Sequence, residues 1–237
     1  MNIALIGYGK MGHEIERIAL ERGHSIISTI DIENPKEFES EKFRLADIAI
    51  EFTGPKTALG NYKKCFAANI PVVSGTTGWL KDLNEVKDAC SKGQTFFYAS
   101  NFSLGVNVFF ALNKKLAEMM NNFPAYNVHI KEVHHIQKLD APSGTAITLA
   151  EDILDRLDRK NSWVKGDQSA SQQLGVISER TGQVPGFHEV TYESDVDTIT
   201  ISHDAKSRVG FALGAVIAAE FTIGKKGFLG MPDLLGF

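Results

Sequence analysis

The chain has 237 residues, which is enough for one large domain or for two smaller domains that each bury a core. Its 25 Lys+Arg and 29 Asp+Glu give a formal net charge of −4, so we expect no nucleic-acid partner and predict a small-molecule partner instead. The two cysteines suit neither a disulfide framework nor a zinc site, and no apolar run approaches the ~20 residues of a membrane span, so we expect a cytoplasmic protein without a bound metal or a membrane contact.

The first hundred residues alternate between two kinds of pattern. Short runs rich in Ile, Val and Phe are separated by segments with apolar residues at helical spacing, which is typical of βα units in a parallel sheet. The expected strands are 2–6, 25–30, 46–52, 71–74 and 95–99, and the expected helices are 11–22, 55–68 and 81–92. We therefore predict an α/β fold with a Rossmann-like, doubly wound parallel sheet. A further helix over 104–120 is expected to lead the chain out of that sheet.

The second part of the chain has few expected helices. A strand at 126–133 and a helix at 145–157 are followed by strands without long helices between them, which favours a second α+β domain on a mixed or antiparallel sheet. Strands are expected at 190–193 and 198–203. The polar stretch 161–173 has no apolar period and is predicted to be a loop or a mobile flap. An apolar helix at 209–221 is expected to be buried and to pack back on the first domain.

A glycine-rich segment follows the first expected strand and opens the first helix. Its residues are Gly7, Tyr8, Gly9, Lys10, Met11 and Gly12. Glycines in this context permit a tight turn and a close approach of the backbone to a pyrophosphate, so we predict an NAD(P)H site. Asp31 lies about 20 residues further on, where a carboxylate can accept hydrogen bonds from ribose hydroxyls. The alternatives are a glycine turn used for packing and an Asp31 that caps a turn.

Two other strand ends are expected at the same edge of the sheet, because the carboxyl ends of parallel strands gather there. They are Gly75, Thr76, Thr77 and Gly78 after one strand, and Ala99, Ser100, Asn101 and Phe102 after the next. Small and hydroxyl residues at these positions suit contacts with the nicotinamide end of the cofactor. Turn chemistry explains the same residues equally well.

Two histidines and a lysine lie between a strand and a helix within residues 132–146. Side chains of consecutive strand residues point to opposite faces, so His134 and His135 reach one ligand only if the strand has already ended. A metal site built on this pair would therefore be strained. Lys138 adds a positive charge beside the histidines.

The expected start of the following helix carries Ser143, Gly144 and Thr145. Hydroxyl groups and free N–H groups at a helix start can receive a substrate carboxylate, and Lys138 and a protonated histidine nearby favour this interpretation. The alternative is an ordinary serine N-cap.

The segment His-His-x-x-Lys-x-Asp-Ala-Pro-Ser-Gly-Thr-Ala, which begins at His134, resembles the signature of the 4-hydroxy-tetrahydrodipicolinate reductase family, also called dihydrodipicolinate reductase. Further segments are similar to that family at 51–55, 75–78, 101–107 and 203–208. The likeness runs from Gly7 to Ala219.

This resemblance implies the NAD(P)H-dependent reduction of a cyclic dicarboxylate in lysine and diaminopimelate biosynthesis. It implies that His134 donates or accepts a proton and that Lys138 donates one. The implied substrate contacts are His135, Gly144 and Thr145. We also predict substrate contacts at Ser143, Thr77 and Arg208, with Thr77 also near the cofactor. It further implies a dinucleotide-binding domain of residues 1–102 plus 208–237, and a domain of residues 103–207 that binds substrate and assembles a homotetramer.

The sequence departs from the family's pattern around the cofactor. The glycine loop is one residue shorter, and Ile32 follows Asp31 where members that hold a 2′-phosphate tend to have Arg. Only Lys36 is close enough to substitute, so we expect NADH to be preferred to NADPH. The rival interpretations are another two-domain nicotinamide dehydrogenase and a non-catalytic protein that senses NAD(P).

Overall fold

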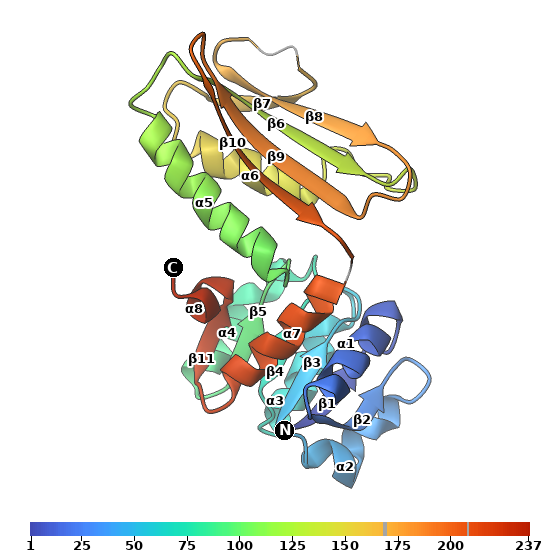
Figure 1. Cartoon of the computed structure of the whole chain (residues 1–237). Helices are drawn as coiled ribbons and strands as arrows, with labels where there is room; N and C mark the ends of the chain where they lie inside the picture. Colours follow the sequence, from blue (N-terminus) through green and yellow to red (C-terminus); the bar gives the residue numbers. More distant parts are fainter. Residues whose placement is uncertain (168–169, 208) are drawn as a thin grey trace. The chain divides into compact units, whose positions relative to one another are not determined.

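The computed structural model describes residues 1–167, 170–207 and 209–237 (Figure 1). It divides into two compact units, which we describe separately. The first unit comprises Met1–Leu104 and Val209–Phe237, and the second comprises Gly105–Arg208. In the part of the chain that the structure describes, no helix is both long and apolar enough to cross a membrane.

The first unit is built on a six-stranded parallel sheet in the order β11-β5-β4-β3-β1-β2. The strands are β1 (Asn2–Ile6), β2 (Ser25–Ile30), β3 (Ile48–Glu51), β4 (Val72–Ser74), β5 (Thr95–Tyr98) and β11 (Gly227–Gly230). The helices are α1 (Lys10–Glu21), α2 (Glu41–Arg44), α3 (Ala58–Ala67), α4 (Leu83–Ser91), α7 (Val209–Thr222) and α8 (Met231–Leu235), with short 3-10 helices at Pro35–Glu39 and Leu80–Asp82. The predicted parallel α/β fold is confirmed.

Both faces of this sheet are covered, which is why its strands read as nearly continuous apolar runs. In β1, Ile3 and Leu5 join a core formed with α1 and α7, whereas Ala4 and Ile6 join the core beneath α3 and α4. The doubly wound arrangement is therefore confirmed. The strand order reverses between β1 and β3, and ligands of such sheets bind outside the carboxyl ends of the strands at this reversal.

Helix α7 returns from the far end of the sequence to this sheet and lies beside α1 (Figure 1). Its close approach depends on Gly214, where a Cβ would lie 1.8 Å from the carbonyl oxygen of Phe102. The predicted helix at 209–221 is confirmed. The strand β11 and the helix α8 that follow it were not predicted.

The second unit is a five-stranded mixed sheet in the order β10-β9-β6-β8-β7. Its strands are β6 (Asn127–His134), β7 (Ser162–Lys165), β8 (Gln173–Arg180), β9 (Gly186–Glu193) and β10 (Thr198–Ala205), and its helices are α5 (Leu104–Met120) and α6 (Gly144–Leu154). β9 runs antiparallel to β6 and β10, and β8 runs parallel to β6 and β7. The predicted mixed sheet is confirmed. Both helices pack on one face of it and bury one apolar core.

The prediction of a loop over residues 161–173 was wrong in part. β7 occupies Ser162–Lys165 and pairs with β8 at the edge of the sheet. Its four residues are half-buried or exposed, so no apolar period reveals the strand in the sequence. Residues 168 and 169 of this stretch lie outside the described residues.

Candidate active site

The glycine-rich segment forms a tight turn between β1 and α1. Gly7 has a φ of +90°, and a Cβ there would lie 2.0 Å from the carbonyl oxygen of Phe52. A Cβ on Gly12 would lie 2.4 Å from the carbonyl oxygen of Gly7, whereas nothing lies within 4 Å of the Cβ position of Gly9. Gly9 is also the N-cap of α1, whose first turn carries no acidic side chain. This turn fits a phosphate group, which the free N–H groups of the helix would meet.

Asp31 lies directly after β2 and is exposed. Its Oδ2 accepts a hydrogen bond from the Tyr8 N–H at 3.1 Å, so the carboxylate is fixed against the glycine turn. The Tyr8 hydroxyl donates to Glu16 on α1. Beside Asp31, a cavity of about 550 Å³ opens where the strand order reverses. It is lined by Ile6, Ile30, Asp31, Ile32, Pro35, Phe38, Thr53, Gly54, Thr57, Asn61 and Lys64. Its position and its apolar walls fit the nucleoside end of a dinucleotide.

The segment after β4 places its two threonines differently. The Thr76 hydroxyl is buried, donates to Glu51 Oε1 at 3.1 Å and accepts from the Thr53 N–H at 2.8 Å. Glu51 is itself fully buried and also accepts from the Ser74 hydroxyl at 2.7 Å. Thr77 is exposed. Thr76 therefore ties two strand ends together, while the side chain of Thr77 is accessible to a ligand.

The segment after β5 is more deeply packed. Phe102 lies in the core, with its ring centroid 5.6 Å from that of Phe52 and 5.9 Å from that of Phe97. Ala99 is buried and Ser100 is exposed, and Asn101 accepts a hydrogen bond from the Ser103 N–H at 2.9 Å. The side chain of Phe102 is thus part of the core, and its carbonyl oxygen faces α7, where a Cβ on Gly214 would lie 1.8 Å from it.

The second unit gathers the catalytic candidates at the carboxyl end of β6. Burial alternates along this strand, which places Glu132 and His134 on its inner face. His134 is the last residue of β6, and His135 lies beyond the end of the strand. Burial, followed by the nearby His188, lowers the pKa of His134 to about 4 against an opposing effect of Glu132. The His134 imidazole is therefore neutral at pH 7.

Glu132 joins several groups of this site through its carboxylate, although no role was predicted for it from the sequence. Its carboxylate is fully buried and accepts from the Ser143 N–H at 3.1 and 3.2 Å and from Arg180 Nη2 at 3.1 Å. His134 Nδ1 and His188 Nε2 lie 3.4 and 3.6 Å from its Oε2. Burial pushes the pKa of Glu132 upward, but the nearby His188 ring and hydrogen bonds from Ser143 and Arg180 outweigh it and hold that pKa below its usual value. The carboxylate is therefore charged at pH 7.

The start of α6 lies next to this carboxylate. Ser143 is the N-cap, and its hydroxyl accepts from the Ala146 N–H at 3.2 Å and lies 3.1 Å from His188 Nε2. The Ser143 side chain therefore caps α6, while its predicted contact with substrate stays a prediction. The N–H groups of Gly144 and Thr145 belong to the first helical turn, where a helix offers no internal acceptor. Nothing lies within 4 Å of a Cβ on Gly144, so space is open beside these donors.

Lys138 is half-buried, and its ammonium donates to both carboxylate oxygens of Asp140 at 2.8 Å. This hydrogen bond lowers the pKa of Asp140. Arg180 connects the same loop to the site because it donates to the carbonyl oxygens of Lys138 and Asp140. A substrate carboxylate would have to compete with Asp140 for Lys138. Arg208, the remaining predicted substrate contact, lies outside the described residues.

Glu132, His134 and His188 each offer a ligand atom within 4.8 Å of the others, as a metal site would. Both oxygens of Glu132 already accept hydrogen bonds, and Arg180 brings a positive charge to 3.1 Å. A dication would meet that repulsion and would have to displace those donors. We therefore interpret this cluster as a hydrogen-bonded network.

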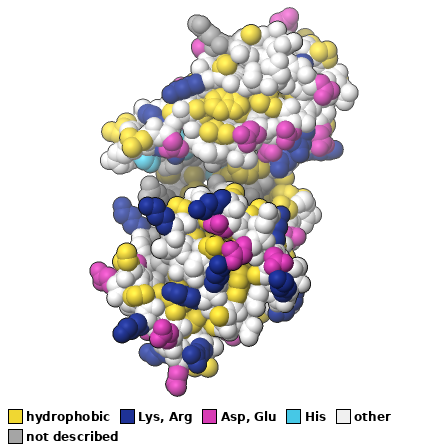
Figure 2. Space-filling view, turned by 180° about the vertical axis from the view of Figure 1, so that it is seen from behind, with side chains coloured by type: hydrophobic (Ala, Val, Ile, Leu, Met, Phe, Trp, Pro, Cys, Tyr) yellow, Lys and Arg dark blue, Asp and Glu magenta, His cyan; other side chains and the backbone are white. Residues whose placement is uncertain are grey.

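Charged side chains of both signs are interspersed on the face shown in Figure 2.

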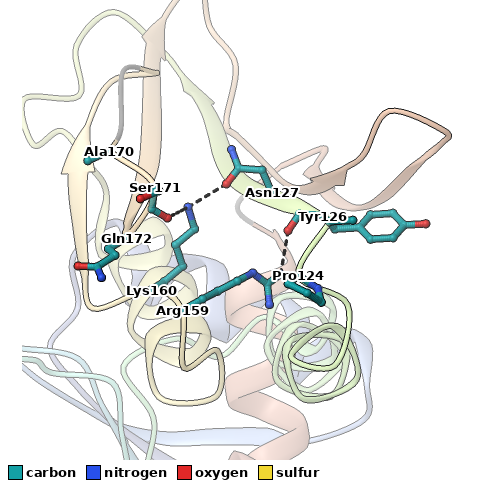
Figure 3. Close-up of a pocket in the computed structure, with 9 residues that line it drawn as sticks. Pro124, Tyr126, Asn127, Arg159, Lys160, Ala170, Ser171 and Gln172 are labelled. Atoms are coloured by element: carbon teal, nitrogen blue, oxygen red, sulfur yellow. Dashed lines mark hydrogen bonds between the residues drawn. The ribbon is translucent and has the colours of Figure 1, made fainter.

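A second cavity of about 460 Å³ lies at the opposite end of β6 (Figure 3). There the buried Lys160 donates to Asn127 Oδ1, Ser171 O and Gln173 O at 2.7 to 3.0 Å, and Arg159 donates to two carbonyl oxygens. Burial lowers the pKa of Lys160. All three ammonium protons are used, so Lys160 serves to fasten the segment before β8 to the start of β6.

The glycine turn at the strand reversal, together with a second unit that presents a buried histidine, a lysine and an open helix start, defines a two-domain NAD(P)H-dependent oxidoreductase. Residues 1–102 match the family model described as dihydrodipicolinate reductase, N-terminus, and residues 105–235 match the model of the C-terminus. The chain belongs to the dihydrodipicolinate reductase family.

Relatives of the same length support this membership. The 4-hydroxy-tetrahydrodipicolinate reductase of Christiangramia forsetii is 50% identical over 236 residues, which cover 99% of this chain and 98% of the relative. That of Alkaliphilus metalliredigens is 34% identical over 96% of this chain and 95% of its own. Among solved structures, the dipicolinate-bound dihydrodipicolinate reductase from Paenisporosarcina sp. TG-14 has the same fold, with a TM-score of 0.78 at 22% identity and 98% coverage of both chains.

Proposed function

We propose that this protein reduces 4-hydroxy-tetrahydrodipicolinate to tetrahydrodipicolinate with NAD(P)H, a step of lysine and diaminopimelate biosynthesis. The observation that carries the proposal is the cluster at the end of β6, where His134, Lys138 and the open start of α6 lie together in a chain whose full-length relatives bear this enzyme's name. Purified protein should oxidise NADH or NADPH only when the cyclic substrate is present. Cofactor binding without oxidation would favour a sensing protein, and oxidation with another substrate alone would favour a different dehydrogenase.

The cofactor residues of the first unit and the substrate residues of the second take separate roles in this proposal. NAD(P)H supplies a hydride to the substrate ring. The glycine turn and Asp31 hold the dinucleotide, and Thr77 lies at the nicotinamide end. The N–H groups of Gly144 and Thr145 receive one substrate carboxylate, and His135 is a further substrate contact.

Lys138 and His134 supply the proton that balances the charge left by hydride transfer. Lys138 donates to both oxygens of Asp140 in the free protein and donates to the substrate once it leaves that carboxylate. His134 is neutral in the free protein, and the negative charges of a bound dicarboxylate would raise its pKa. Both groups are thus suited to general acid catalysis in the complex.

By family membership we also expect a cytoplasmic homotetramer assembled through the sheet of the second unit. Analytical ultracentrifugation at micromolar concentration tests the assembly, and a monomer would contradict it.

We predict that NADH is preferred to NADPH, or that both are used. Asp31 is exposed beside the nucleoside cavity, where its negative charge would repel a 2′-phosphate, and the exposed Ile32 next to it offers no cation. The measurement is kcat/KM for each cofactor at fixed substrate and ionic strength. A tenfold advantage for NADPH, about 1.4 kcal/mol, would contradict the prediction, and its loss in Lys36→Ala would identify Lys36 as the cause.

We predict that Gly144→Leu weakens the binding of dipicolinate, a planar dicarboxylate, by roughly tenfold or more, about the loss of one hydrogen bond to a charged group. Outside the neighbouring residues and the helix's own backbone, nothing lies within 4 Å of a Cβ at this position, so the larger side chain starts in open space beside the helix N–H groups. Gly144→Ala is the matched control with a small effect. Isothermal titration should give an unchanged affinity for NADH in both variants; unchanged dipicolinate affinity in Gly144→Leu would place the carboxylate receptor elsewhere.

A further inference from the structure

The buried carboxylate of Glu132 has several partners among the residues of the proposed active site. Glu132 has no exposed surface and sits in the middle of the sheet, across from Ser178 on β8 and His188 on β9. A buried carboxylate is costly unless it is paired and hydrogen-bonded, and this one is both. Three of its partners lead to groups with a proposed role: Arg180 on β8, Ser143 at the start of α6, and His134 on β6 itself.

The first two partners, Arg180 and Ser143, position the loop of Lys138 and the start of α6. Arg180, at the end of β8, donates to Glu132 and also to the carbonyl oxygens of Lys138 and Asp140, so it positions the loop that carries the lysine. The Ser143 N–H donates to Glu132, which fixes the cap of α6 and therefore the direction of the N–H groups that follow.

The third partner is the imidazole of His134. Its Nδ1 is buried, has no hydrogen-bond partner among the described residues, and lies 3.4 Å from Glu132 Oε2. An anion at that distance favours a proton on the nearer nitrogen, so the neutral ring carries its hydrogen on Nδ1 and presents Nε2 as the acceptor. On its other side the ring lies against Gly186, where a Cβ would be 3.2 Å from Nε2. The ring is thus held between a carboxylate and a glycine.

We propose that Glu132 is the positioning residue of this enzyme: its buried carboxylate fixes the tautomer of His134, the loop of Lys138 through Arg180, and the start of α6 through Ser143. His134 and Lys138, which transfer protons, and the N–H groups of α6 that receive the substrate carboxylate are then all positioned by Glu132. The proposal rests on the proposed function for its turnover readout only, since the tautomer of His134 is measured without substrate.

The test is Glu132→Gln, which keeps the size of the side chain and removes its charge. We expect kcat to fall roughly ten- to hundredfold, as for residues that orient a reacting group, and dipicolinate affinity to fall as well. In ¹⁵N NMR spectra at pH 7, with His134 assigned through His134→Gln, the native ring should carry its proton on Nδ1. In Glu132→Gln the proton should move to Nε2, because the amide of Gln can donate to Nδ1.

The matched control is Glu179→Gln on the neighbouring strand β8. Glu179 is exposed and pairs with Lys131 at 2.9 Å on the outer face of the sheet, so the same charge is removed without touching the site. Its kcat should stay within about twofold of the native value, as expected for a surface pair, with the tautomer unchanged.

A native ring protonated on Nε2 overturns the proposal. So does a Glu132→Gln protein with unchanged kcat, or one whose kcat falls while the tautomer stays the same, since Glu132 would then act on the fold alone. If Glu132→Gln does not fold, Glu132→Asp replaces it. The shorter side chain keeps the negative charge but places it farther from His134, and kcat and the tautomer of His134 are interpreted in the same way. Native protein without turnover but with the Nδ1 proton would contradict the proposed function and leave the support role of Glu132 intact.

Discussion

His134→Gln is expected to lower kcat by roughly two orders of magnitude or more, the range of lost general acid–base assistance. The ring is the last side chain of β6, shares the Glu132 carboxylate with the start of α6, and is neutral in the free protein because burial lowers its pKa to about 4. Glutamine keeps a polar side chain at this position but cannot exchange a proton. NADH affinity, measured by fluorescence titration, should not change.

His129→Gln is the matched control for this prediction. It removes a second histidine from the same strand, but five residues earlier and on the outer face of the sheet, where the residues are only half-buried. Its kcat should be close to the native value. If His134→Gln turned over as fast as this control, His134 would have no part in proton transfer.

The parallel sheet of the first unit could be predicted because both its faces are covered, so each central strand is a short apolar run that local sequence reveals. Two short edge strands, β7 and β11, were not predicted. β7 and β11 have four residues each, all half-buried or exposed, and they are strands only because β8 and β5 pair with them. Pairing between distant segments leaves no periodic signal in an isolated short run.

The candidate site divides in the same way. His134, Lys138 and Gly144 lie within one continuous segment, so their proximity could be predicted from the sequence. Glu132 lies in that segment too, and the period of two along a strand would have placed it on the same face as His134. Arg180 and His188 reach the site from β8 and β9, and their positions depend on strand register that the sequence does not specify.

Gly214→Ala is expected to lower the free energy of unfolding by about 3 kcal/mol, the upper part of the usual range for overpacking. Helix propensity alone predicts the opposite sign, because alanine stabilises a helix by up to about 1 kcal/mol relative to glycine. The Cβ would lie 1.8 Å from the carbonyl oxygen of Phe102, however, and Phe102 cannot easily move because its ring packs against Phe52 and Phe97. Relief of the contact would require α7 to withdraw from the sheet.

Gly60→Ala supplies the matched control, since Gly60 also lies in a helix of the first unit, α3, and nothing is within 4 Å of its Cβ position. It should raise the free energy of unfolding by about 0.5 to 1 kcal/mol through propensity alone. Urea unfolding in a Trp163→Phe background, where the fully buried Trp79 reports on the first unit, compares the two variants. Equal stabilisation by both alanines would contradict the close contact between α7 and Phe102, whereas opposite signs would show that this contact limits how near α7 approaches the sheet that carries the glycine turn.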